Sequence, residues 1–266
     1  MAGDAKAGWF DRVVLELLRQ LRWSFLPPLM IYFSYGVSGL TAIVGPNACG
    51  KSTLLRSLAR LQPAGGGQAV LDGKAIHRQS SRSVAQRLAI LPQTPTAPEG
   101  LTVRDLAARG RTPHQSALRQ WSEQDAGAVA RALELTNMAG NADRPLETLS
   151  GGQRQRAWIA MALAQDTGIL LLDEPTTYLD LPHQIELLKL VQQLNRETGR
   201  TVAMVLHDIN LAARFASHMI ALKDGRVFCQ GPPAGVVTGP VMQSVFALPC
   251  RIIADPVHGT PHVIPE

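Results

Sequence analysis

Short apolar runs and helix-forming segments alternate along most of this 266-residue chain. The apolar runs are continuous, which is typical of strands that are buried on both faces of a parallel sheet. They lie at Leu40–Val44, Leu88–Leu91, Ile169–Leu172 and residues 202–206. Segments of helical composition lie between or after them, at residues 52–59, 157–165, 185–197 and 210–216. Because strands that alternate with helices form parallel sheets, the pattern predicts an α/β fold with a mostly parallel core.

Two shorter patterns predict antiparallel elements. Residues 69–71 form a short strand before Asp72-Gly73, a dipeptide that favours a hairpin reversal. Residues 219–222 and 227–228 flank a second such reversal and predict a closing hairpin. Between residues 94 and 165 the chain is mostly helical in pattern, so we expect a helical subdomain of about this extent inserted into the core.

The first 38 residues fit this pattern least well. Residues 11–21 have helical apolar spacing, and the apolar stretch at residues 23–37 is broken by Pro27 and Pro28. We therefore expect a helix followed by an irregular segment there. The stretch is also too short to span a bilayer, and the first twelve residues lack the apolar centre of a secretory signal, so we expect no membrane crossing.

Composition narrows the function classes only slightly. The chain carries a net charge of +5, which suits an anionic partner such as nucleic acid, a membrane surface or a nucleotide. Aromatic residues make up only 5% of the chain and are not interleaved with basic stretches, which argues against base stacking on nucleic acid. Three cysteines form no paired framework, and we expect reduced thiols in the cytoplasm.

The segment directly after Leu40–Val44 is the strongest chemical signal. It fits the phosphate-loop pattern G-x-x-x-x-G-K-[ST] with Gly45, Pro46, Asn47, Ala48, Cys49, Gly50, Lys51, Ser52 and Thr53. Glycines let backbone N–H groups close on phosphate oxygens, and the following helix adds its positive end. We expect Lys51 to reach the outer phosphates of ATP and Ser52 to ligate Mg²⁺. The alternative is a glycine-rich turn that happens to precede a lysine.

Two acidic residues follow another buried strand, Ile169–Leu172. Asp173 is placed to hold Mg²⁺ directly or through water, as a carboxylate at the carboxyl end of a buried strand. Glu174 is placed to orient or deprotonate the water that attacks the terminal phosphate. The alternative is an acidic pair that caps the next turn.

A second glycine-rich helix start lies further along the chain. Ser150 is a good N-cap, and Gly151, Gly152 and Gln153 follow it at the positive end of a helix. One nucleotide does not need two phosphate cradles from the same subunit. We therefore expect the second cradle to serve the nucleotide of a partner copy, which makes the active form a head-to-tail homodimer. The alternative is an ordinary glycine-capped helix.

This pairing of motifs resembles the ATP-binding subunits of ABC transporters, from about Gly39 to the C-terminus. The resemblance implies the ABC-ATPase variant of the P-loop NTPase fold, with a small antiparallel β subdomain. It also implies that Gln93 joins the helical subdomain to Mg²⁺ and the γ-phosphate, and that His207 contacts the γ-phosphate. Tyr178, Leu179 and Asp180 resemble the loop that communicates across the dimer.

A finer resemblance is to the ATPases of ferric-siderophore importers, especially the ferric-enterobactin type. It is carried by residues 110–115, 158–167, 176–181 and 255–261. Heme and cobalamin importers are close relatives, so these cargoes stay open as alternatives. The resemblance implies a peripheral subunit at the cytoplasmic face of the inner membrane, docked on permease subunits and served indirectly by a siderophore-binding protein.

The sequence departs from the family before residue 39. The family has two strands there, with an aromatic residue that stacks on adenine, and the nearest aromatic here is Trp23. We therefore expect an atypical segment at residues 1–38, from a reading-frame or start-site difference, and an ATP-binding domain at residues 39–266.

Three other functions fit the sequence less well. An ABC ATPase acting on DNA needs a long coiled coil between its halves, and a translation-associated one needs two cassettes; the chain has room for neither. A non-enzymatic nucleotide sensor does not need Lys51, Glu174 and His207 together. We expect no nucleic-acid partner.

Overall fold

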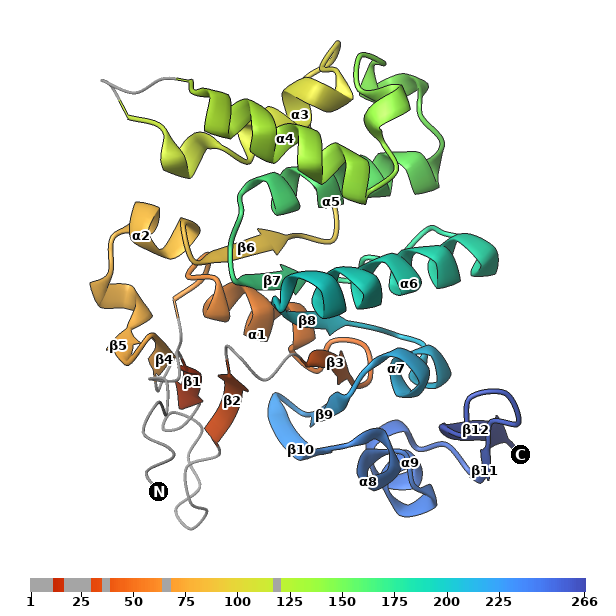
Figure 1. Ribbon diagram of the computed structural model, residues 1–266. Helices are drawn as coiled ribbons and strands as arrows, with labels where there is room; N and C mark the ends of the chain where they lie inside the picture. The colour runs from red at the N-terminus through yellow and green to blue at the C-terminus, as the bar shows by residue number, and fades with distance from the viewer. Residues whose placement is uncertain (1–11, 17–29, 35–38, 64–67, 117–120) are drawn as a thin grey trace, which may run out of the picture.

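The structure is a computed structural model that describes residues 12–16, 30–34, 39–63, 68–116 and 121–266 (Figure 1). Its centre is a six-stranded sheet with the strand order β10-β9-β3-β8-β7-β6. Neighbouring strands are parallel except at one edge, where β10 pairs with β9 in antiparallel fashion. The strands are β3 Leu40–Val44, β6 Leu88–Leu91, β7 Ile169–Leu172, β8 Thr201–Val205, β9 His218–Lys223 and β10 Arg226–Gly231. The predicted α/β fold with a mostly parallel core is confirmed.

Helices cover both faces of this sheet. Alternate residues of β3 point to opposite faces. Ile43 packs with Leu55 of helix α1, Lys51–Leu58, while Ala42 lies in the core cluster that contains Leu188 of α6 and Ala212 of α7. Helix α6 spans Leu181–Thr198, α7 spans Ile209–Phe215, and the short helices α8, Pro233–Val236, and α9, Gly239–Phe246, follow β10. A strand covered on both faces is apolar at nearly every position, which explains the long apolar runs.

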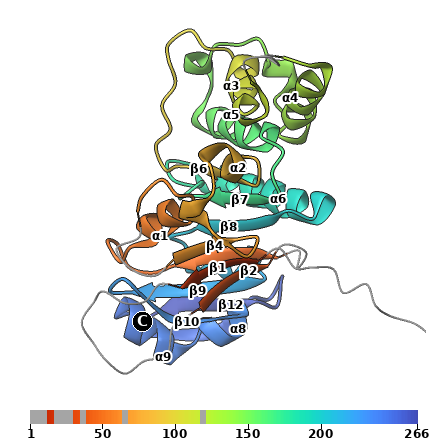
Figure 2. The ribbon, with the colours of Figure 1, turned by 90° about the vertical axis from the view of Figure 1, so that its left-hand side faces the viewer.

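The chain between β6 and β7 contains three helices, and these form a separate layer. They are α3 Val103–Arg109, α4 Glu123–Leu135 and α5 Gly151–Ala164, joined through the 3₁₀ turns η2 Thr112–His114, η3 Ala139–Asn141 and η4 Leu146–Thr148. Figures 1 and 2 show this layer stacked on the β6 end of the molecule. Each helix begins with a capping box, in which the side chains of Thr102, Ser122 and Ser150 accept bonds from the first turn. The layer lies within residues 94–165, where the helical subdomain was predicted.

The second sheet corrects the prediction for the N-terminal segment. Its four strands have the order β2-β1-β4-β5, with β1 at Arg12–Glu16, β2 at Met30–Ser34, β4 at Gln68–Leu71 and β5 at Lys74–Ala75. The helix predicted over residues 11–21 is wrong for residues 12–16, which form a strand. Pairing on both sides, with β2 and with β4, supplies backbone hydrogen bonds that override the local helical spacing. The sheet therefore joins chain segments on both sides of residue 38, and the domain boundary there stays a prediction.

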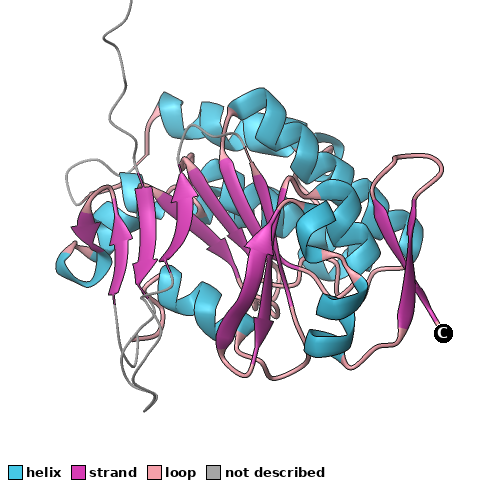
Figure 3. Ribbon diagram, turned by 90° about the horizontal axis from the view of Figure 1, so that it is seen from below, coloured by secondary structure: helices cyan, strands magenta, loops and turns pink. Residues whose placement is uncertain are grey.

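Other short elements complete the structure. The turn η1, Ile76–Arg78, and helix α2, Ser81–Ala85, lead into β6. At the other end of the chain, strands β11, Cys250–Ala254, and β12, Pro261–Pro265, form a hairpin at the edge opposite the four-stranded sheet (Figure 3). The Asn210 side chain fastens this hairpin to α7, because it donates to the Val263 carbonyl and accepts from the Val263 N–H. Within the described ranges, no helix combines the length and the hydropathy needed to cross a bilayer.

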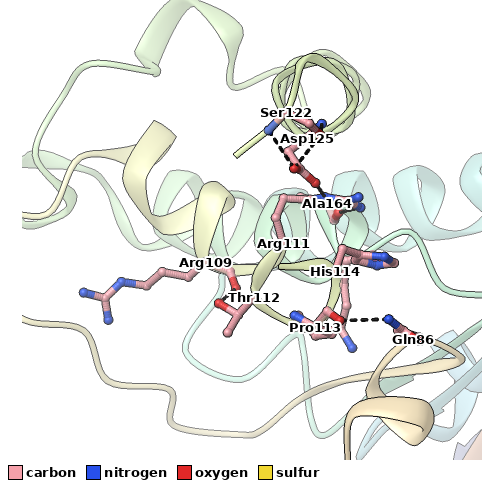
Figure 4. A network of polar contacts seen from close by, with 10 residues as sticks. Gln86, Arg109, Arg111, Thr112, Pro113, His114, Ser122, Asp125 and Ala164 are labelled. Atoms are coloured by element: carbon pink, nitrogen blue, oxygen red, sulfur yellow. Dashed lines mark hydrogen bonds and ion pairs between the residues drawn. The ribbon is translucent and has the colours of Figure 1, made fainter. Parts of the chain in front are cut away.

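A buried ion pair holds the helical layer together. Arg111 Nε donates to Asp125 Oδ1 at 2.8 Å, and the two side chains are only 3% and 1% exposed (Figure 4). The guanidinium also donates to the Ala164 carbonyl at 2.8 Å, so the pair ties the start of α4 to the end of α5. The hydroxyl of Ser122, followed by Arg111, lowers the pKa of Asp125 against the opposing effect of its burial.

We expect Asp125→Asn to lower the free energy of unfolding by about 3 kcal/mol at pH 7, because it leaves the Arg111 charge buried without its partner. Asp143→Asn is the matched control, since its pair with Arg104 is exposed to solvent. Urea denaturation measures both variants. Because the folded state depresses the Asp125 pKa, its contribution is present above the unfolded value of about 3.9 and is lost as the pH falls through the folded value. The gap between wild type and Asp125→Asn should therefore close in acid; a gap that stays constant there contradicts this account.

Candidate functional site

The predicted phosphate loop connects β3 to α1 with a backbone that enters the left-handed region twice. Ala48 and Gly50 have φ angles of 61° and 97°, in the left-handed region. Gly45 lies so close to strand β9 that an added Cβ would stand 2.4 Å from the Leu222 carbonyl oxygen. The loop therefore rests directly on the neighbouring strand, and Gly45 is required for this close approach.

Lys51 is folded into the loop that precedes it. Its ammonium donates to the carbonyl oxygens of Gly45, at 2.9 Å, and Pro46, at 2.8 Å, and the residue is 5% exposed. Lys51 is also the first residue of α1, where backbone N–H groups at a helix start have no partner within the helix. A buried ammonium and a helix N-terminus thus meet at one point, which is an arrangement that binds anions.

Ser52 connects this loop to the acidic pair after β7. Its hydroxyl donates to Asp173 Oδ1 at 2.8 Å. Asp173 is 1% exposed, its Oδ2 is buried without a hydrogen-bond partner, and Arg56 Nη2 lies 4.0 Å from that oxygen. Burial raises the pKa of Asp173, while the bond from Ser52 opposes this. A hydroxyl and a carboxylate with one unsatisfied oxygen fit Mg²⁺, which prefers oxygen ligands.

The carboxylate of Glu174 is held by side chains from three other positions. Gln93 donates from its amide to Oε2, His207 Nε2 lies 2.7 Å from Oε1, and Thr177 donates to Oε2 at 3.2 Å. Glu174 itself is buried and has a φ of 53°. Such strain in a non-glycine residue is typical of functional sites. The carboxylate is therefore fixed in direction rather than free to rotate into solvent.

These residues come from the carboxyl ends of four neighbouring parallel strands. Gln93 follows β6, Asp173 and Glu174 follow β7, His207 follows β8, and the phosphate loop follows β3. Ligand sites of open α/β sheets lie at this edge. The structure thus brings together the predicted residues of the phosphate loop, the acidic pair, Gln93 and His207.

The predicted second cradle lies elsewhere. Ser150 caps α5: its hydroxyl accepts from the Gln153 N–H at 3.3 Å, and the Gln153 side chain accepts from the Ser150 N–H at 3.1 Å. The Ser150 hydroxyl keeps its own hydrogen for another acceptor. Gly151 has open space where a Cβ would be. Among the described residues, no hydrogen bond or ion pair joins residues 150–153 to the phosphate loop, so the two glycine-rich helix starts of one chain lie apart.

Asp180 lies beside this second cradle. It pairs with His183 Nδ1, which lowers the pKa of Asp180, and the His183 ring stands 3.1 Å from where a Cβ of Gly152 would be. The preceding Tyr178 is 85% exposed and has a φ of 66°. His183 therefore brings Asp180 close to residues 150–153.

Sequence reasoning missed three members of these sites: Arg56, Thr177 and His183. Arg56 is one helical turn beyond Ser52, and Thr177 is three residues beyond Glu174, so spacing alone offered a signal for both. His183 had no such signal, because its contact with Gly152 arises from the packing of α6 on α5. The predicted adenine-stacking candidate, Trp23, lies outside the described residues.

The chain matches the ABC transporter family over residues 31–177. It is 55% identical over 227 residues to YusV of Bacillus subtilis (strain 168), which is named as a siderophore transport system ATP-binding protein; this covers 85% of the chain and 82% of the relative. It is 53% identical over 225 residues to the ferric enterobactin transport ATP-binding protein FepC of Escherichia coli (strain K12), covering 85% and 83%.

Solved structures show the same fold. An inward-facing ABC transporter described as of the metal-chelate type superposes with a TM-score of 0.81 at 26% identity, over 97% of this chain and 98% of the other. The ATP-binding cassette MJ0796, in a dimeric post-hydrolysis state with ADP and Pi, gives a TM-score of 0.66 at 26% identity, over 83% and 98%.

The family match covers more than half of the chain, and the two relatives match most of it at over 50% identity. The predicted recognition and ABC-ATPase fold are confirmed. The chain therefore belongs to the ABC transporter family and is one of its ATP-binding, ATP-hydrolysing subunits.

Proposed function

We propose that this chain hydrolyses ATP at the interface of a head-to-tail homodimer and thereby drives import of a ferric siderophore of the enterobactin type through a membrane permease. The observation that best supports ATP hydrolysis is that Gln93 and His207 both bond to the Glu174 carboxylate, next to Asp173. The names of the relatives support the cargo, since YusV is named for siderophore transport and FepC for ferric enterobactin transport.

The phosphate loop would hold the phosphates of ATP. Lys51 would exchange its two carbonyl partners for phosphate oxygens, and the N–H groups of residues 48–53 would add neutral donors. Ser52, Asp173 and Gln93 would hold Mg²⁺. When bound, Mg²⁺ would supply positive charge to the phosphate oxygens.

Glu174 would act on the attacking water. A buried carboxylate whose oxygens are directed by neighbours can accept the proton of a water that is aligned with the terminal phosphate. His207 is half exposed and bonded to Glu174, so it is positioned to contact the γ-phosphate on the solvent side of that carboxylate. Gln93 would report the presence of the γ-phosphate to the helical layer that follows it.

The second copy would complete the site. Ser150, Gly151, Gly152 and Gln153 offer a hydroxyl and a helix N-terminus that their own chain does not use on its phosphate loop. Asp180, which His183 brings close to Gly152, and the exposed Tyr178 would also face the partner. The dimeric state of the MJ0796 cassette supports this arrangement. Closure on ATP and opening after hydrolysis would move the permease.

The remaining partners follow from the transport role. We infer that the chain docks on permease subunits at the cytoplasmic face of the inner membrane, with residues 94–101 facing the permease. A siderophore-binding protein would act on the other side of that permease and would not touch this chain.

Replacing Glu174 by Gln should reduce kcat for ATP hydrolysis by about 100-fold or more, because the water loses its base, while the affinity for Mg-ATP is retained. Release of phosphate and binding of a fluorescent ATP analogue measure the two effects. Glu134→Gln, on the exposed face of α4, is the control and should hydrolyse ATP like the wild type. A Glu174→Gln variant with more than a tenth of the wild-type kcat contradicts the assigned role.

Replacing Gly45 by Ala should weaken ATP binding by more than tenfold, since the new Cβ would overlap the backbone of β9 and displace the loop. Gly140→Ala is the matched control, because a Cβ there meets no atom within 4 Å. Isothermal titration with ATP compares the two variants. Equal affinities would show that the close approach of the loop to β9 does not matter for binding.

Deleting the gene should abolish growth of the host on a ferric siderophore as the sole iron source. Growth should return with the wild-type gene and fail to return with the Glu174→Gln gene. Heme and cobalamin uptake, measured in the same strains, test the alternative cargoes. If heme uptake alone is lost, the siderophore assignment is wrong although the ATPase assignment stands.

A further inference from the structure

Two sequence segments have no role in the chemistry described above, and the structure brings them together. They are residues 110–115, which include η2, and the end of α5 with Gln165. They meet where the helical layer rests on α2 and the edge strand β6. Figure 4 shows the turn of η2 with its polar contacts.

Gln165 joins the end of α5 to the start of β6. Its side-chain amide donates to the Ala85 carbonyl, at 2.5 Å, and to the Leu88 carbonyl, at 3.0 Å. Its own carbonyl oxygen accepts a bond from His114 Nε2 at 2.7 Å. One residue therefore links α5, β6 and η2.

The turn η2 makes a second connection to the core. The Pro113 carbonyl accepts a bond from Gln86 Nε2 at 2.8 Å (Figure 4). It also accepts a bond from Arg82 Nε at 3.0 Å. The same turn is pressed against α5, because a Cβ on Gly110 would stand 2.1 Å from the Met161 carbonyl oxygen. The end of α5 is thus bonded to the start of β6 on one side and to the turn η2 on the other.

We propose that Gln165, supported by His114 and the Pro113 carbonyl, is the pivot that sets the position of Ser150 relative to the catalytic carboxylate. Helix α5 has 14 residues, so Ser150 lies about 21 Å from the pivot. A rotation of about 10° about the pivot moves the other end by roughly 3.5 Å, which exceeds the length of a hydrogen bond. Small changes at Gln165 therefore decide whether Ser150 reaches a phosphate on the second copy.

Strand β6 connects this pivot to the chemistry. Gln165 bonds to Leu88, the first residue of β6, and Gln93 lies just beyond the last one and donates to Glu174. A four-residue strand is short and rigid, at about 13 Å. Helix α5 and strand β6, which are joined at Gln165, thus set the distance between the two cradles of one chain. Gln165 is a positioning residue: it touches neither nucleotide nor water.

This inference rests on the proposed two-copy site, and the test separates the two. In the Glu174→Gln background, Gln165→Ala should raise the ATP concentration for half-maximal dimerisation about fivefold or more, since two hydrogen bonds are lost. Binding of ATP by single copies at high dilution should stay unchanged, because the phosphate loop is untouched. Analytical ultracentrifugation and fluorescence anisotropy measure the two quantities.

Gln79→Ala is the matched control. Gln79 also donates from its amide to two carbonyls, but these belong to Leu71 of β4 and Lys74 of β5, not to β6 or the helical layer. This control should dimerise like its parent. His114→Ala removes a different bond of the same pivot and should act in the same direction as Gln165→Ala, which covers the case in which one variant fails to fold.

A second measurement does not need the dimer. Spin labels on cysteines placed at the exposed positions Glu147 and Lys189, with the three native cysteines replaced, report the distance between the helical layer and helix α6 of the core in single copies. Gln165→Ala should broaden that distance distribution, and Gln79→Ala should not. An unchanged distribution, or dimerisation of Gln165→Ala at the parental ATP concentration, overturns the pivot. Failure of the parent itself to dimerise would overturn the proposed function instead, while the distance measurement still decides the pivot.

Discussion

The hydrogen bond from Ser52 to Asp173 is the interaction on which the rest of the site depends. It joins the start of α1 to the end of β7 across 121 residues of sequence. The bond forms because β3 and β7 lie in one parallel sheet with only β8 between them, so that their carboxyl ends emerge at the same edge. Burial of Asp173 raises its pKa and leaves one oxygen unsatisfied, which is costly in the absence of a cation. The fold therefore keeps a buried carboxylate with one oxygen free of hydrogen bonds directly beside the start of α1.

The second constraint is the separation of the two cradles. Helix α5 carries Ser150 at its N-terminal end, and Gln165 at its C-terminal end bonds to the carbonyls of Ala85 and Leu88. Gly152 allows α5 to pack against His183, which in turn holds Asp180. In this arrangement the surface that would face a second copy is built from α5 and the start of α6, and it is distinct from the sheet edge that holds the phosphate loop.

The hydrophobic pattern and the short motifs of the sequence predicted those elements that depend on neighbouring residues in the chain. The continuous apolar runs predicted β3, β7 and β8, and the phosphate loop and acidic pair were placed correctly at strand ends because parallel strands share an edge. The strand at Arg12–Glu16 was missed, because its pairing with β4 depends on residues more than 50 positions away. The contacts of Gln165 with Ala85 and Leu88, and of His183 with Gly152, were missed because each depends on tertiary packing that the local pattern does not reveal. Thr177 and Arg56 could have been found from their spacing to Glu174 and Ser52.

The central claim is that the two cradles of one chain serve different nucleotides, and cross-linking across copies tests it most directly. An isotopically heavy copy with Lys51→Ala, which cannot hold its own ATP, would be mixed with a light wild-type copy and an ATP analogue that carries a photoreactive group on the γ-phosphate. The account predicts that light activates labelling of residues 150–153 on the heavy copy, identified by mass spectrometry, and only when the light copy is present. Labelling of residues 150–153 confined to the light copy that holds the nucleotide would contradict it.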